Sequence, residues 1–133
     1  MRYPIRSAID KFNKLLGLEE DPHMQDWEIE CGDPSRLHEF ILCYDEHAST
    51  DDEKFTLMAL ILGSYEEYHE LKGPSVGEWK MIKERLETDL DVHCDHIVYY
   101  ACPETEDSEE WFPITPQMRQ LLPKCAQQLH PAD

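Results

Sequence analysis

The central helix of the fold is predicted by residues 54–62, which read Lys54-Phe55-Thr56-Leu57-Met58-Ala59-Leu60-Ile61-Leu62. This run is apolar on nearly all sides, which is typical of a helix in the middle of a protein. The pattern becomes one-sided at Tyr65, Tyr68 and Leu71, and Gly73-Pro74 is a typical helix end. Residues 49–53 place capping hydroxyls and carboxylates before the run, where they favour a helix start.

Two more helices are predicted before this segment. The first has Ser7 as its cap, ends at Gly17 and spaces its apolar residues by three and four: Ile9, Phe12, Leu15 and Leu16. The second begins at Asp33-Pro34, runs to about His47 and carries one apolar stripe: Leu37, Phe40, Ile41 and Tyr44. Residues 18–33 fit an extended piece or a loop anchored by Trp27 and Ile29, and we interpret them as a loop.

Three segments follow the central helix. A helix is predicted from Ser75 to near Asp89, with Trp79, Ile82 and Leu86 on one face. Residues 97–100 fit either a buried strand or a helix starting near Asp91; we favour the helix because the chain lacks two further β-rich runs to pair with. After an acidic loop over 103–110, Thr115-Pro116 opens a last short helix that Pro123 closes.

These segments predict an all-α protein with a single compact domain of five to six helices, and stacked helical hairpins are one arrangement consistent with the pattern. We expect the domain to span residues 1–122 and residues 123–133 to be a loose C-terminal tail. The predicted core consists of Leu57, Met58, Ile61, Trp79, Ile82 and Leu86.

The composition excludes several classes of function. The chain has 29 acidic and 12 basic residues and a net charge of -17, which disfavours binding to nucleic acids or to anionic membranes. The longest apolar run, residues 57–62, is far shorter than the roughly 20 residues that span a bilayer. Charged residues recur through Lys14, so we expect no signal peptide. Five cysteines without a CxxC spacing fit a reduced, cytoplasmic location.

The negative charge is concentrated in two blocks. Residues 21–53 carry 11 acidic residues and one basic residue, and residues 87–110 carry nine acidic residues and no basic one. If both blocks lie on one side of the molecule, they create a field that steers a basic partner into contact. An acidic surface also serves solubility alone, and carboxylates at helix starts serve as caps, so this second interpretation stays open.

From the charge we predict a module that binds a basic protein, and within that class we predict an immunity-type or antitoxin-type inhibitor of a toxin. This hypothesis is an analogy from size, charge and the lack of a catalytic motif. Carboxylates supply the steering, and aromatic side chains supply the anchors that set the lifetime of the complex. The predicted partner-binding residues are Asp45, Glu46, Asp51, Asp52, Glu66, Glu70, Tyr65, Tyr68 and Trp111.

Two side-chain clusters suggest an alternative, a small enzyme or metalloprotein. Asp89, His93 and His96 fall on one face of a continuous helix and are zinc-ligand types, although no HExxH or paired-cysteine motif accompanies them. Glu39, Cys43 and His47 also share a helix face, but acidic neighbours disfavour the thiolate that a nucleophilic cysteine needs. We therefore expect no enzymatic activity, no metal and no cofactor.

Overall fold

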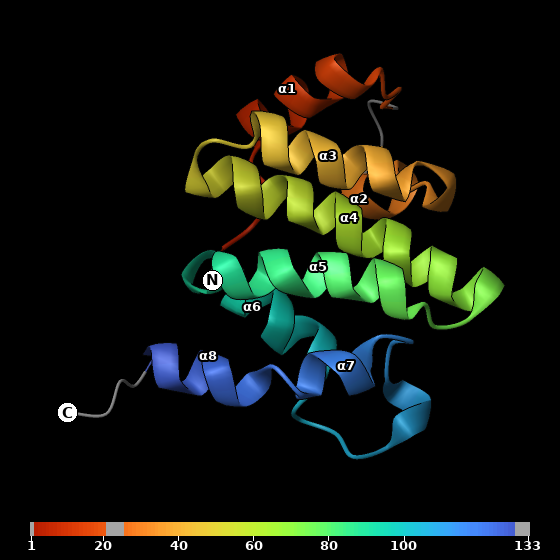
Figure 1. Ribbon diagram of the computed structural model, residues 1–133, viewed down its shortest axis with the longest axis vertical. Coiled ribbons are helices and arrows are strands. Elements are labelled where there is room, and N and C mark those ends of the chain that lie inside the picture. Colours follow the sequence, from red (N-terminus) through yellow and green to blue (C-terminus); the bar gives the residue numbers. More distant parts are fainter. Residues whose placement is uncertain (1, 21–25, 130–133) are drawn as a thin grey trace. The chain divides into compact units, whose positions relative to one another are not determined.

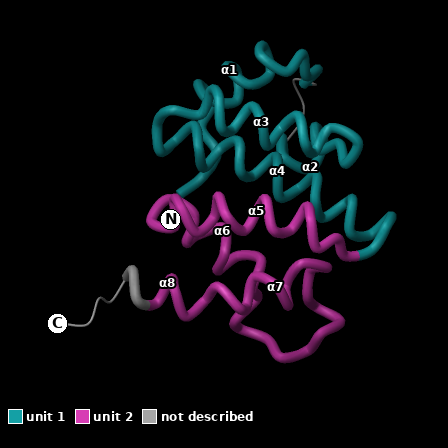
Figure 2. Tube along the Cα trace, in the orientation of Figure 1, with its two compact units in different colours: residues 1–73 teal, residues 74–133 magenta. Residues whose placement is uncertain are grey.

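The computed structural model describes residues 2–20 and 26–129, which form helices and no strand (Figure 1). This confirms the all-α prediction, including the helical interpretation of residues 97–100. The chain divides into two compact units, unit 1 with residues 1–73 and unit 2 with residues 74–133 (Figure 2). The extent of the predicted single domain, residues 1–122, stays a prediction.

The helices of each unit follow the chain in order. Unit 1 contains α1 (Arg6–Leu16), α2 (Trp27–Glu30), the 3-10 helix η1 (Pro34–Arg36), α3 (Leu37–His47) and α4 (Asp51–Lys72). Unit 2 contains α5 (Val76–Thr88), α6 (Leu90–Ala101), the 3-10 helix η2 (Ser108–Glu110), α7 (Thr115–Arg119) and α8 (Leu122–Leu129). Among the described helices, none combines the length and the apolar character that a membrane span requires.

Helix α4 is the central element of unit 1, and α1, α2 and α3 all contact it. Every residue from 55 to 62 is buried, as the apolar run predicts. The start of α4 is a capping box: the Thr50 hydroxyl accepts from the Glu53 amide, and the Glu53 carboxylate accepts from the Thr50 amide. The helix ends before Gly73. Sequence pattern and caps therefore agree on this helix.

The start of α1 differs from the prediction. Its N-cap is Ile5, and Ser7 lies exposed within the first turn. The Ile5 amide donates to the Thr56 hydroxyl of α4 at 3.2 Å, which fixes Ile5 in an extended conformation just before the helix. At the other end, Gly17 has a φ of 63°, the left-handed conformation expected of a helix-ending glycine.

Residues 27–30, interpreted as part of a loop, form the short helix α2. Trp27 is buried as predicted and its indole donates to Asn13 Oδ1 at 2.8 Å, but Ile29 is 67% exposed and is not an anchor. Residues two apart share a face in a strand and not in a helix, which explains why one of the two side chains is buried and the other is not. The backbone of α2 approaches α4 closely: a Cβ on Gly63 would lie 2.4 Å from the Glu28 carbonyl oxygen.

Unit 2 differs from prediction at one core position and at its C-terminal end. Ile82 and Leu86 are fully buried, whereas Trp79 is only half-buried. Residues 122–129, of which 123–129 were expected to belong to a loose tail, form α8. Pro123 occupies the first turn of α8, where its missing N–H costs no hydrogen bond, so it starts a helix rather than closing one. The end of the predicted tail, 130–133, lies outside the described residues.

Candidate functional site

Four predicted partner-binding carboxylates lie around the turn between α3 and α4. Asp45 and Glu46 belong to the last turn of α3, Asp51 and Asp52 begin α4, and all four are exposed. Asp52 also forms an ion pair with Arg2 at 3.4 Å. Asp51 and Asp52 lie in the first helical turn, where a carboxylate favourably faces the positive end of the helix dipole.

The remaining predicted residues of α4 lie at its other end. Glu66 follows Asp52 by 14 residues, which separates them by about 21 Å along the helix axis. The structure therefore does not join the six predicted carboxylates into one patch. Tyr65 is fully buried and stacks on Tyr68 with ring centroids 6.0 Å apart, so it is not available as an exposed anchor. Tyr68 is half-buried, and Lys72 lies 5.5 Å from its ring centroid.

The α3–α4 turn itself is organised by Glu53. Its carboxylate accepts hydrogen bonds from the Ser49 amide at 3.0 Å and the Ser49 hydroxyl at 2.9 Å. It also pairs with Lys11 Nζ at 2.9 Å, and the same ammonium donates to the His47 carbonyl at 2.7 Å. The backbone hydrogen bond from Ser49, followed by the Lys11 contact, lowers the pKa of Glu53 to about 2. The Glu53 carboxylate therefore holds the turn, and its charge is already balanced by Lys11 within unit 1.

We expect Glu53→Ala to lower the free energy of unfolding by about 1–2 kcal/mol at neutral pH, because it removes a cap and the partner of Lys11. The pKa of Glu53 is depressed in the folded state, so its contribution is present above the ordinary pKa of 4.5 and is lost as the pH falls toward 2. Urea titrations of both proteins should therefore show a difference that shrinks across this range. A difference that is constant down to pH 2 would contradict the assignment.

Among the described residues of unit 2, exposed carboxylates are most concentrated in the acidic loop, residues 103–110. Its five carboxylate residues are all exposed: Glu104, Glu106, Asp107, Glu109 and Glu110. The loop is also held in place by Arg119 of α7. Its Nε donates to the Ala101 carbonyl at 2.8 Å. Its Nη2 donates to the Cys102 carbonyl at 2.6 Å and to the Thr105 carbonyl. Its Nη1 pairs with Glu106 at 3.1 Å. The Arg119 guanidinium therefore links α7 to the backbone just before the acidic loop, at residues 101 and 102, and to the Thr105 backbone within it.

Trp111 lies at the end of the acidic loop and is half-buried. Its indole nitrogen donates to the Thr105 carbonyl at 3.0 Å, and the Arg119 guanidinium carbon lies 4.1 Å from the ring centroid. This is a cation–π contact, so one face of the predicted anchor is already occupied within unit 2. Trp111 therefore lies at the end of the acidic loop and also helps to hold its conformation through the hydrogen bond to Thr105.

An aromatic cluster of Tyr99, Tyr100 and Phe112 lies next to the acidic loop. Phe112 is 5.3 Å from Tyr99 and 5.1 Å from Tyr100 between ring centroids. Tyr99 is 60% exposed, and Tyr100 is buried. The Thr115 hydroxyl donates to the Tyr100 carbonyl at 2.6 Å and accepts from the Phe112 amide, which fixes the chain after the loop against α6.

Sequence reasoning missed Tyr99, Phe112 and Arg119. The signal for the two aromatics is their place beside the acidic block, and the signal for Arg119 is that it is the first basic residue after that block. We call the acidic loop together with Tyr99, Trp111 and Phe112 the acidic–aromatic surface.

The cluster of Glu39, Cys43 and His47 is brought together by the structure. These side chains line one hollow of about 150 Å³ between α1 and α3. Cys43 is buried, and its burial raises the pKa of the thiol above the ordinary value, which disfavours the reactive thiolate. The structure thus brings the predicted residues together at one hollow, but the burial of Cys43 disfavours the thiolate that a nucleophilic role requires.

The cluster of Asp89, His93 and His96 lies at the start of α6. His93 and His96 are buried with ring centroids 5.7 Å apart, and the Asp89 carbonyl accepts from the His93 amide at 3.1 Å. Within residues 2–20 and 26–129, no three or more histidine, cysteine or acidic side chains are grouped so that they could hold a metal ion.

No family model, curated protein or solved structure matches this chain. Its own surfaces are therefore the guide to its function. Of these, the acidic–aromatic surface combines exposed charge, an exposed aromatic ring and a loop fixed by hydrogen bonds, whereas the carboxylates of α4 are spread along the helix.

Proposed function

We propose that this chain is an acidic protein-binding module that engages a basic protein through its acidic–aromatic surface. The observation that carries the proposal is that Arg119 and Trp111 hold five exposed carboxylates on one short loop beside the exposed ring of Tyr99. A loop that served only solubility would need no such fixation, whereas recognition loops are commonly positioned by a rigid scaffold.

The charge of this surface suits a cationic partner. Residues 103–112 contain five carboxylates and no Lys or Arg, and Arg119 offsets one of these charges through Glu106. A field of one sign raises the association rate of an oppositely charged protein, and salt weakens the effect. The same field repels the phosphates of nucleic acids and anionic membranes.

The aromatic side chains suit the second part of recognition, the lifetime of the complex. Aromatic residues are frequent among the side chains that contribute most to binding. Tyr99 offers an exposed ring, and an arginine or lysine of the partner gains a cation–π contact by stacking on it. The contact between Arg119 and Trp111 shows the same chemistry within unit 2.

Our finer proposal is that the partner is a toxin and that this chain is its immunity-type or antitoxin-type inhibitor in the cytoplasm. A small acidic module without a catalytic motif suits the task of covering a basic surface. A toxin that acts on nucleic acid needs such a basic surface to bind phosphates.

The proposal is tested by a pull-down from native lysate at low and at high salt with two charge-reversed baits of equal net charge. One carries Glu104→Lys and Glu109→Lys in the acidic loop, and the other carries Glu66→Lys and Glu70→Lys on α4. The recovered protein is then identified by mass spectrometry, and its association rate with each bait is measured. We expect a basic protein whose association with the loop variant is slower by about tenfold or more.

Two further baits separate the aromatic contribution from the charge. Tyr99→Ala removes the exposed ring from the surface, and Tyr3→Ala removes a ring of similar exposure, 66% against 60%, from unit 1. We expect faster dissociation for Tyr99→Ala alone. Recovery of only proteins whose binding is insensitive to salt and to both loop changes would end the proposal, and a loss confined to the α4 variant would move the site to Glu66 and Glu70.

A further inference from the structure

A second surface, in unit 1, combines a hollow with exposed leucines. The hollow lies between α1 and α3 and is lined by Leu15, Leu16, Glu39, Leu42, Cys43, Glu46 and His47. Leu15 and Leu42 are 47% and 55% exposed, although most large apolar side chains of the unit are buried. Two open leucines at one hollow leave apolar area that a partner's side chain would remove from water.

The volume of the hollow indicates what fits into it. Pockets for cofactors and drug-sized ligands enclose about 300–1,000 Å³, so a hollow of about 150 Å³ is too small for them. A cavity of about 150 Å³ in another protein holds one benzene molecule. The hollow therefore matches a single leucine or phenylalanine side chain.

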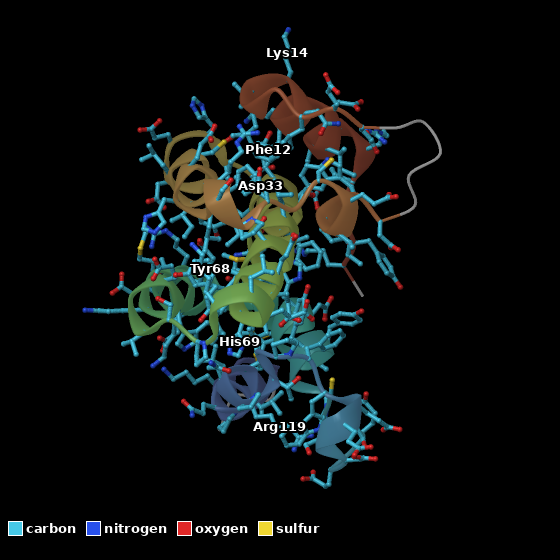
Figure 3. All side chains as sticks on the ribbon, turned by 90° about the vertical axis from the view of Figure 1, so that its right-hand side faces the viewer. Phe12, Lys14, Asp33, Tyr68, His69 and Arg119 are labelled. Atoms are coloured by element: carbon cyan, nitrogen blue, oxygen red, sulfur yellow. The ribbon has the colours of Figure 1, made fainter. Side chains whose placement is uncertain are left out.

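The charged side chains around the hollow differ in whether they are already paired within unit 1. Arg36 pairs with Glu39 at 2.7 Å and donates to the Leu16 carbonyl at 2.7 Å, so this carboxylate is neutralised within unit 1. Lys11 is engaged by Glu53 and by the His47 carbonyl, and Lys14 points away from the other helices of the unit (Figure 3). Glu46 is 58% exposed, and its contact with His47 Nε2 is long, at 3.8 Å. It is the carboxylate best placed to meet a cation from outside.

Leu42 and Glu46 are one helical turn apart and so lie on one face of α3. A partner helix that inserts an apolar side chain beside Leu42 and carries Lys or Arg one turn away would match both at once. A second copy of this chain would bring another net charge of -17 to the same place, which disfavours self-association here.

We propose that the hollow between α1 and α3 binds one leucine or phenylalanine from an amphipathic, basic helix of a partner, with Glu46 pairing with a lysine or arginine one turn from that anchor. The inference rests on the proposed function in that it requires a basic partner, but it uses a surface separate from the acidic–aromatic one. In this binding mode an amphipathic helix of the partner packs against the hollow, and Glu46 lies at the edge of the hollow.

The probe for the test is a synthetic amphipathic helical peptide with leucine on one face and lysine on the other. Its matched controls are the same peptide with alanine in place of leucine and the same peptide with glutamate in place of lysine. Binding to the full chain is measured by fluorescence anisotropy, and the methyl signals of Leu15, Leu42 and Leu71 are followed by NMR. Circular dichroism confirms that each protein variant keeps its helices.

Matched protein variants separate this site from general attraction between a basic peptide and an acidic protein. Leu42→Ser is compared with Leu71→Ser, which removes a leucine that is 70% exposed on α4, away from the hollow. Glu46→Lys is compared with Glu67→Lys, an exposed carboxylate on α4 with the same change in net charge. We expect about tenfold weaker binding for Leu42→Ser and a larger loss for Glu46→Lys than for its control.

Absence of peptide binding, or equal losses for Leu42→Ser and Leu71→Ser, would overturn the inference. The two proposals fail separately. If the lysate partner depends on Tyr99 while the peptide ignores Leu42, the hollow is not a docking site and the proposed function stands. If the peptide depends on Leu42 but no salt-sensitive basic protein is recovered, the hollow stands as a peptide site and the proposed function fails.

Discussion

Replacing Ile61 by alanine is expected to lower the free energy of unfolding by about 2–5 kcal/mol. The Ile61 side chain is fully buried in the middle of α4, the helix that α1, α2 and α3 contact. Alanine removes methyl and methylene groups from a closely packed interior, and the loss combines the transfer free energy of those groups with the cavity left behind. Urea unfolding followed by circular dichroism measures the change.

Leu71→Ala is the control for this experiment, since Leu71 belongs to the same helix but is 70% exposed. We expect this exposed substitution to change the free energy of unfolding by no more than about 0.5 kcal/mol. The comparison separates the burial of Ile61 from any change in helix propensity. Equal unfolding midpoints for Ile61→Ala and the unmodified chain would mean that the centre of α4 does not form the core.

The sequence predicts α4 well because several signals agree there. The apolar run, the Thr50–Glu53 capping box and Gly73 each indicate the same helix. The same reasoning is less exact at Ile5, because the hydrogen bond to Thr56 that fixes the start of α1 comes from a helix 51 residues later. At Ile29 the prediction is wrong because it depends on a choice of period, two or 3.6, that four residues do not determine.

The candidate sites show the same limit. The spacing of Glu39, Cys43 and His47 correctly places them on one face of α3, but the hollow is completed by Leu15 and Leu16 of α1, which no spacing within α3 indicates. Likewise, an aromatic stripe does not reveal that Tyr65 is buried while Tyr68 is half-buried. The local periodicity of the sequence predicts which side chains share a helix face, whereas tertiary packing determines which helix faces contact each other.

Arg119 is the residue whose role depends most on the tertiary structure. Its acceptors are the carbonyls of residues 101, 102 and 105, and its guanidinium also covers the Trp111 ring. A lone arginine after an acidic block suggests an ion pair, which the contact with Glu106 supplies. The carbonyl contacts matter more, because charge-assisted hydrogen bonds at part-buried positions contribute more to stability than an exposed ion pair does.

Arg119→Ala is therefore expected to lower the free energy of unfolding by about 2–3 kcal/mol, since it removes charge-assisted hydrogen bonds to three carbonyl groups. The control is Lys124→Ala, which removes one positive charge from the same unit and leaves the acidic loop untouched, because Lys124 pairs with Glu87 of α5. Hydrogen exchange should accelerate at the loop amides of Arg119→Ala that bond within the loop, those of Asp107, Glu109 and Glu110.

Arg119→Ala can either strengthen or weaken the binding of a basic partner, and the direction distinguishes the effect of loop order from the effect of net charge. If attraction between net charges alone governed binding, removal of the Arg119 cation beside the acidic–aromatic surface would strengthen the complex. If the fixed loop governs binding, the variant must order five carboxylates on contact, and this entropic cost weakens the complex. We expect weaker binding for Arg119→Ala and unchanged or slightly stronger binding for Lys124→Ala, measured by the dissociation rate of the protein recovered in the pull-down. Stronger binding for both variants would show that charge acts without the geometry of the loop.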